Sequence, residues 1–290
     1  MTGRPCNLPV RANGFTLIEL MIALTVMSLV LIAVFSTFFR SQKVGQTMTT
    51  TVNLRQGVRG ADQLLERELR MAGSGWGRRA VDRYSSGGTD SLFAVNFGPG
   101  GAALCDSVSI MGGWTAATTL RAGMVSPWSS LPVTSTAGFA VNDLVVVTNG
   151  ARAHLFQVTA VQASPAQLSN ASSSSLNPPV GSNLANWPAG GYATGAQVYR
   201  VSWVTYKIDS TTFRRAALVR RVFGGTPQLV AYDVSGLQIR YRMQDGSTTR
   251  SPSSIYMVDE IVPIVWTRQA VRGQATRVDS VWAVVRPRTF

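Results

Sequence analysis

Hydrophobic positions along the chain follow two patterns, one helical and one typical of strands. The helical pattern opens with twenty consecutive uncharged residues from Leu20 to Phe39, and Arg40 ends the run. At about 1.5 Å per residue, a helix of this length spans roughly 30 Å, the thickness of the hydrocarbon core of a bilayer. No second run of that length follows. The pattern therefore predicts a single transmembrane helix near the N-terminus.

The helical pattern continues beyond the apolar run. An amphipathic stripe, apolar apart from Arg55, recurs there at three- and four-residue steps: Val44, Met48, Val52, Arg55, Val58, Ala61, Leu65 and Leu69. Glu66 and Arg70 have the spacing of an ion pair across one helical turn, and Gly73 is a typical helix stop. One helix from about Thr16 to Ala72 is predicted, with its first half in a membrane or filament core and its second half carrying a head.

From about residue 80 the period changes to two, which is typical of strands. Leu237, Ile239, Tyr241 and Met243 alternate with polar residues and predict one buried and one solvated face. The stretch from Ser172 to Gly191 is rich in turn residues and predicts an exposed loop. The predicted strands are Ser91–Phe97, Asp106–Met111, Asn142–Thr148, His154–Val161, Gln197–Lys207, Phe213–Phe223, Leu237–Met243, Ile255–Trp266 and Val278–Arg286. The fold class is therefore α+β, with a mainly antiparallel β head.

Composition excludes a disordered chain and raises one question about partners. Hydrophobic residues make up 45% of the 290 residues and charged residues 14%, which is too apolar for disorder. The formal net charge of +13 permits contact with nucleic acid or anionic lipid without demonstrating it. Two arginine pairs in one predicted strand form a possible basic contact surface: Arg214, Arg215, Arg220 and Arg221.

The chain has no pattern of residues that predicts catalysis, a metal site or a cofactor. Its one histidine, His154, falls inside a predicted strand, where a packed residue is commoner than a catalyst. Cys105 has no evident activating base and is interpreted as a small core residue. Asp259 and Glu260 lack the ligand spacing of a calcium loop. We therefore do not expect an enzyme.

Three interpretations compete for the N-terminal 40 residues. A secretory signal peptide has a shorter apolar stretch, followed by a small-residue cleavage site that this chain lacks. A plain signal anchor fits the length but leaves Glu19 unexplained, because a carboxylate at the edge of a membrane segment is costly and usually functional. The third interpretation rests on the segment from Arg11 to Leu24, RANGFTLIELMIAL. This segment resembles the type III signal of type IV pilins and pseudopilins.

The resemblance implies a processing route. In this family a prepilin peptidase cuts after the glycine, here Gly14, and methylates the new N-terminal residue, here Phe15. The apolar helix then stays in the mature protein, in which Glu19 is the fifth residue. In a filament core, the Glu19 carboxylate would pair with the Phe15 ammonium of a neighbouring subunit, a contact that sets register more than it adds stability. The remaining alternative places Glu19 harmlessly at the lipid headgroups.

The rest of the chain also resembles a family, more diffusely. The segment Leu54–Gly73 and stretches beginning at Asp143, Ala196 and Pro227 resemble PilW-like minor pilins. Related heads often carry a cysteine near the position of Gly150, so a disulfide of that kind is absent here. The J-type pseudopilin of type II secretion has a similar plan and stays open as an alternative, as does a pilus-tip module that binds DNA or a surface.

These resemblances imply an organisation, partners and a location. The expected parts are a cleaved leader (1–14), a transmembrane or filament-core helix (15–39), its amphipathic continuation (40–73) and a β-rich head (74–290). The expected partners are the prepilin peptidase, other minor pilins, the major pilin and the inner-membrane assembly platform; nucleic acid is possible but not favoured. The protein would sit in the inner membrane with a periplasmic head and then enter the pilus.

Overall fold

One long helix and many short strands make up the described part of the chain. The structure, a computed structural model, describes residues 16–290 apart from 78, 87, 103–104, 114–115, 214, 251, 253–256, 270–276 and 287–290, and describes only the backbone at 47, 50, 51, 53, 54, 97, 99–102, 105, 106, 268, 269 and 277–279. The chain divides into two compact units, residues 1–53 and 54–290. Helix α1 (Leu17–Arg70) begins in the first and ends in the second.

The helix matches its prediction at both ends. It runs from Leu17 to Arg70, against the expected Thr16 to Ala72, and the predicted ion pair between Glu66 and Arg70 forms. Beyond its end, Gly73 adopts a φ of 72°, a conformation that a side chain disfavours, and its N–H donates to the Met111 carbonyl at 2.9 Å. Gly73 therefore joins the end of the helix to the sheet.

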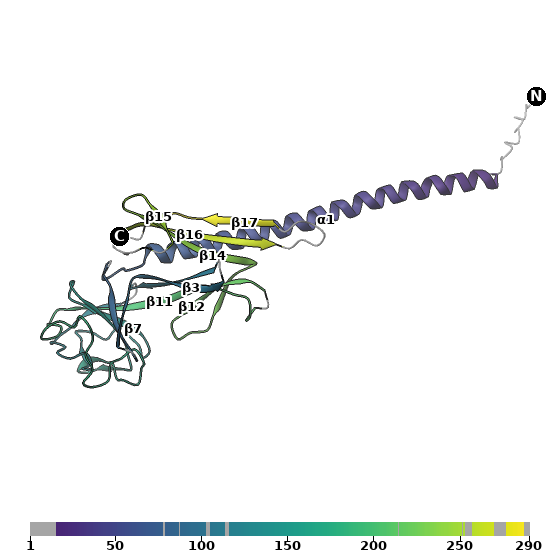
Figure 1. The fold of residues 1–290 in the computed structure, drawn as a ribbon. Helices are drawn as coiled ribbons and strands as arrows, with labels where there is room; N and C mark the ends of the chain where they lie inside the picture. Colours follow the sequence, from purple (N-terminus) through teal and green to yellow (C-terminus); the bar gives the residue numbers. More distant parts are fainter. Residues whose placement is uncertain are drawn as a thin grey trace, which may run out of the picture. The chain divides into compact units, whose positions relative to one another are not determined.

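The second unit, which we call the head, is built mainly of strands (Figure 1). The strands are β1 (Val81–Ser85), β2 (Gly88–Leu92), β3 (Val95–Ala102), β4 (Cys105–Gly112), β5 (Ala117–Thr119), β6 (Leu131–Pro132), β7 (Leu144–Thr148), β8 (Ala153–Gln157), β9 (Ala160–Ala163), β10 (Ala166–Ser169), β11 (Gln197–Asp209), β12 (Ala217–Val222), β13 (Gln228–Tyr232), β14 (Val234–Met243), β15 (Thr248–Thr249), β16 (Val258–Gln269) and β17 (Arg277–Trp282).

Most neighbouring strands run antiparallel. The large sheet has the order β17-β16-β14-β4-β11-β7-β8-β1-β2, and a small sheet has the order β6-β10-β9. Strand β11 is central: its first residues pair with β7, and the residues from Ser202 onward pair with β4. Parallel pairing occurs between β1 and β8 and between β4 and β14. The α+β class with a mainly antiparallel head is confirmed.

The end of helix α1 packs on this sheet through its apolar stripe. Val58, Ala61, Leu65 and Leu69 are almost fully buried, in one core with residues of β4, β11, β14 and β16. Burial of a leucine or valine side chain of this kind contributes about 1.5–3 kcal/mol. The second half of the predicted stripe is therefore a core face.

The first half of the predicted stripe is not a core face. Val44, Met48 and Val52 are 52%, 64% and 51% exposed, and they lie in the first unit. The three- and four-residue spacing correctly placed these residues on one side of the helix. The spacing alone could not show whether another part of this chain packs on that side of the helix.

Two other sequence predictions need correction within the head. Gln238 is buried, although the alternation along β14 placed it in solvent; its amide lies beside the Arg250 guanidinium. The loop between Ser172 and Gly191 is not simply exposed, since Leu176, Asn177 and Leu184 are buried. The Asn177 amide donates to the carbonyl of residue 157 at 2.8 Å and accepts from the N–H of that residue at 2.8 Å, which fixes the loop to β8.

A buried carboxylate on the helix gives a prediction of pH-dependent stability. Asp62 is only 8% exposed, and its Oδ1 has no hydrogen-bond partner among the described residues. Burial, and secondly the charge of Glu66, raise the pKa of Asp62 to about 6. The folded state therefore favours the protonated carboxyl of Asp62. The contribution of this group to the free energy of unfolding is full below pH 3.8, its pKa in the unfolded chain, and is lost as the pH rises through about 6.

Replacement of Asp62 by asparagine removes the charge and keeps the shape. We expect Asp62→Asn to raise the free energy of unfolding at pH 7 by about 2 kcal/mol, and the gain to vanish below about pH 4. Thermal unfolding of the full chain in detergent at several pH values measures this. The control Asp90→Asn, at a partly exposed carboxylate paired with Arg83, should change stability by about 0.5 kcal/mol or less. A gain that did not depend on pH would contradict the assignment.

Candidate membrane and assembly interface

The start of helix α1 is fixed by Thr16. The N–H of Glu19 donates to the Thr16 hydroxyl at 3.3 Å, and the N–H of Leu20 donates to the Thr16 carbonyl at 3.2 Å. Thr16 is therefore the N-cap, and Glu19 occupies the third helical position, as in a Thr-x-x-Glu capping box. Our sequence analysis missed this role, although the spacing of threonine and glutamate before an apolar run is its signal.

The predicted processing residues adjoin this cap. Gly14 and Phe15 lie outside the described residues, so their roles stay predictions. Glu19 is exposed on the first turn of the helix and makes no ion pair with any residue that the structure describes. Within the described part of the chain, its carboxylate is therefore open to a partner from another molecule, as the assembly hypothesis requires.

The helix that follows has an apolar surface on all sides. The span Leu17–Gln46 is 30 residues long; its most apolar 18 residues have a mean hydropathy of 2.6, and none of them is buried in the structure. The hydroxyl groups of the uncharged run Leu20–Phe39 are satisfied within the helix; Thr25, for example, donates to the Ile22 carbonyl at 2.8 Å, and Ser36 to that of Ala33 at 2.8 Å. By length and composition, this helix can cross a membrane without an unpaired polar group from these side chains.

The structure separates the arginines of the possible basic contact surface. Arg220 and Arg221 are neighbours in β12, so their side chains leave opposite faces of the strand. Arg220 turns to helix α1, where its Nε donates to Glu68 Oε1 at 3.0 Å and its Nη2 forms an ion pair with the same oxygen at 2.9 Å. Arg221 is exposed and donates from Nε to the Gly225 carbonyl at 2.9 Å.

The other arginine pair is also not a free basic patch. Arg215 lies just before β12, forms an ion pair with Asp233, and places its guanidinium 4.9 Å from the centre of the Tyr232 ring. Arg214 lies outside the described residues. Two of the four predicted cations thus have acidic partners within the chain, and a contact surface formed by all four stays a prediction.

The remaining polar residues singled out in the sequence have structural contacts. His154 is fully buried in β8, with Nδ1 2.7 Å from the Tyr192 hydroxyl and Nε2 3.0 Å from the Ala185 carbonyl. Burial lowers the pKa of its imidazole, which favours the neutral form. Asp259 and Glu260 both pair with Arg286. The backbone of Cys105 opens β4, and its side chain lies outside the described residues.

Comparison with known proteins bears on the N-terminal segment. Residues 10–35 match the prokaryotic N-terminal methylation motif, a region that contains Gly14, Phe15 and Glu19. No curated protein matches the chain. The motif and the apolar helix support a type IV pilin-like protein of pilus or pseudopilus assembly, with a prepilin signal and a single helix for membrane anchoring.

Proposed function

We propose that the protein is a minor pilin that takes part in type IV pilus assembly, as a priming or tip subunit. The observation that carries this proposal is the methylation motif at residues 10–35, which overlaps an exposed apolar helix. The same helix ends in the core of a β-rich head through Val58, Leu65 and Leu69. A subunit that moves from a bilayer into a filament needs one continuous helix that carries an apolar membrane segment at its start and a head at its end.

Each part of the chain has a role in this proposal. The prepilin peptidase removes residues 1–14 and methylates Phe15, and the apolar helix holds the protein in the inner membrane with its head in the periplasm. The assembly platform then transfers the helix into a filament, where Glu19 meets the Phe15 ammonium of a neighbour. Partners of the head are the heads of other minor pilins and of the major pilin, a role in which it resembles PilW-like proteins.

The J-type pseudopilin of type II secretion uses the same N-terminal processing, so the helix does not separate these two machines. The phenotype of a strain in which the gene is deleted distinguishes the two machines. A minor pilin is expected to be required for surface filaments, with the major pilin left in the inner membrane of the deletion strain. Normal filaments with a loss of protein secretion would instead support the pseudopilin alternative. Normal filament numbers with loss of DNA uptake would support the pilus-tip binding module.

Processing is the first step to test. Intact-mass analysis of the membrane-extracted protein should show a chain that lacks residues 1–14 and carries one added methyl group. The matched control is the same protein from cells without prepilin peptidase, which should keep residues 1–14 and gain no methyl group. A chain that still carries Met1 in cells with active peptidase would refute the prepilin interpretation.

A further inference from the structure

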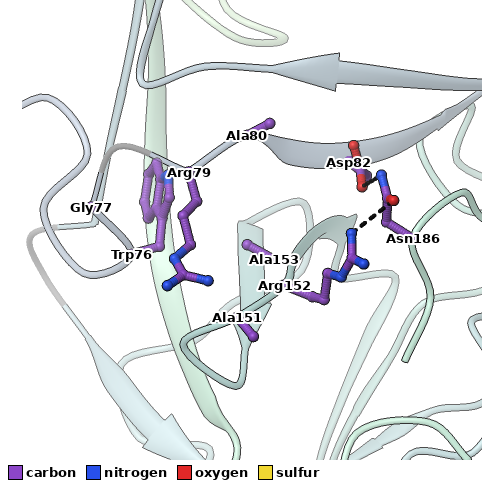
Figure 2. Close-up of a pocket in the computed structure, with 9 residues that line it drawn as sticks. All are labelled: Trp76, Gly77, Arg79, Ala80, Asp82, Ala151, Arg152, Ala153 and Asn186. Carbon is purple, nitrogen blue, oxygen red and sulfur yellow. Dashed lines mark hydrogen bonds between the residues drawn. The ribbon is translucent and has the colours of Figure 1, made fainter. Parts of the chain in front are cut away.

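The head contains a pocket formed by three segments that lie far apart in the sequence (Figure 2). Its volume is about 560 Å³, within the range of about 300–1,000 Å³ that is usual for small-ligand sites. The first segment runs from the end of helix α1 into β1 and provides Trp76, Arg79 and Asp82; the second, the turn before β8, provides Arg152, and the third, a loop, provides Asn186.

One wall of the pocket is held by a chain of hydrogen bonds. Arg152 donates from Nη1 to Asn186 Oδ1 at 2.7 Å, and Asn186 donates from Nδ2 to Asp82 Oδ2 at 2.9 Å. The second oxygen of Asp82 accepts from the Ser91 hydroxyl. Asn186 keeps a φ of 60°, an uncommon conformation for a residue with a side chain. These contacts orient the Arg152 guanidinium and occupy both oxygens of the pocket's carboxylate.

Two further donors have no acceptor among the described residues. Trp76 is 6% exposed, and its indole N–H makes no hydrogen bond within the described part of the chain. Figure 2 shows this nitrogen on the side of the ring that faces Arg79. Arg79 is exposed at the pocket and forms neither an ion pair nor a hydrogen bond with a described residue. A buried donor without an acceptor is costly, so groups of this kind in native proteins usually have a partner.

The charge of the pocket indicates what that partner is. Arg79 and Arg152 bring two guanidinium groups against the single carboxylate of Asp82, whose two oxygens each accept a hydrogen bond within the protein. The open hydrogen-bonding capacity of the pocket is therefore mainly donor capacity, with an excess of positive charge. Guanidinium groups bind carboxylate and phosphate oxygens through paired N–H donors, and these are the anions that such a site prefers.

We propose that this pocket binds a sugar-sized anionic ligand, whose carboxylate or phosphate contacts Arg79 and Arg152. The Trp76 N–H donates to an oxygen of the same ligand. The pocket is much larger than one oxyanion, so the rest of the ligand fills the space beside Ala151 and Ala153. This function does not depend on the proposed role in pilus assembly.

Calorimetric titration of the full chain tests the proposal. The protein is held in a polyoxyethylene detergent, because a glycosidic detergent could occupy a sugar-sized site. The probes are glucose 6-phosphate, glucuronate, glucose and inorganic phosphate. We expect at least one of the two charged sugars to bind with a dissociation constant below about 1 mM, and glucose to bind at least about tenfold more weakly. Inorganic phosphate alone should bind more weakly than the charged sugar that binds.

Variants separate the pocket from a general attraction of anions to a basic protein. Arg79→Gln should weaken binding of the charged sugar by about tenfold or more, since it removes a charged donor that makes no hydrogen bond or ion pair with a described residue. The control Arg121→Gln removes an exposed arginine outside the pocket and should change the dissociation constant by about twofold or less. Trp76→Phe keeps an aromatic ring, removes the N–H, and should also weaken binding.

Each outcome of the titrations either supports or overturns the proposed site. Binding of glucose 6-phosphate or glucuronate that is lost in Arg79→Gln and kept in Arg121→Gln supports the site. No binding of either charged sugar at about 10 mM overturns it. Equal losses in the two arginine variants also overturn it, because the anion would then respond only to net charge. Inorganic phosphate binding as tightly as the charged sugars would overturn the sugar-sized part of the proposal.

Discussion

Replacement of Arg220 by alanine is expected to lower the free energy of unfolding of the head by about 3 kcal/mol. Arg220 donates a hydrogen bond to Glu68 and forms an ion pair with it; the Glu68 side chain is only 8% exposed, and without Arg220 its carboxylate stays in a largely buried position with its main cation removed. Tyr206 lies beside the pair, and burial followed by the charge of Glu68 raises the pKa of its phenol, so it stays neutral and adds no charge to the pair. Thermal or denaturant unfolding of the full chain in detergent measures the loss.

Arg221 provides the matched control. It is the next residue along β12, it is exposed, and its side chain bonds only to the nearby Gly225 carbonyl among the described residues. Arg221→Ala is therefore expected to cost about 1 kcal/mol or less. If both variants had equally small effects, the Glu68 contact would not contribute to folding, and Arg220 would again be available as part of a basic contact surface.

The second large effect is expected at Glu19, in the first unit of the chain. Glu19→Ala removes a charge from the edge of the apolar helix, so membrane insertion should be unharmed and cleavage after Gly14 should continue. Incorporation into filaments should fall about tenfold or more, because the ammonium of a neighbouring Phe15 loses its partner in an apolar surrounding. The ratio of variant protein in sheared filaments to that in membranes measures this.

Two further variants show whether the charge itself is responsible. Glu19→Gln keeps the shape and a hydrogen-bonding group and should be about as defective as Glu19→Ala. Glu66→Ala removes a carboxylate from the other end of the same helix, where it pairs with Arg70 at the surface, and should be incorporated normally. Normal incorporation of Glu19→Ala would remove the basis for the registration role.

The helix was well predicted because its signals are local. The uncharged run, the four-residue spacing of Glu66 and Arg70, and the glycine at 73 each depend only on nearby residues, and the structure agrees with all three. The alternation along β14 was predicted for the same reason, and its buried positions Leu237 and Tyr241 are correct.

The pairing of distant strands, the Arg220 contact and the pocket could not be predicted, because each depends on partners distant in the sequence. Strand β1 pairs in parallel with β8, where Asp82 lies opposite His154, a residue far along the chain. Arg220 and Glu68 are 152 residues apart, so no local pattern could distinguish a paired arginine from a free one. The pocket has the same origin, since Trp76, Arg152 and Asn186 meet only through the tertiary fold.

The cap at Thr16 has an electrostatic consequence for a processed chain. The first turn of a helix carries partial positive charge, because its N–H groups point out of the helix end. A cut after Gly14 would place a new ammonium group one residue before this cap, where it opposes the helix dipole. Glu19 is the acidic residue of that turn and can offset both charges. In the Glu19→Ala variant, we therefore expect the first turn of the helix to fray after cleavage and to stay ordered when the leader is still attached.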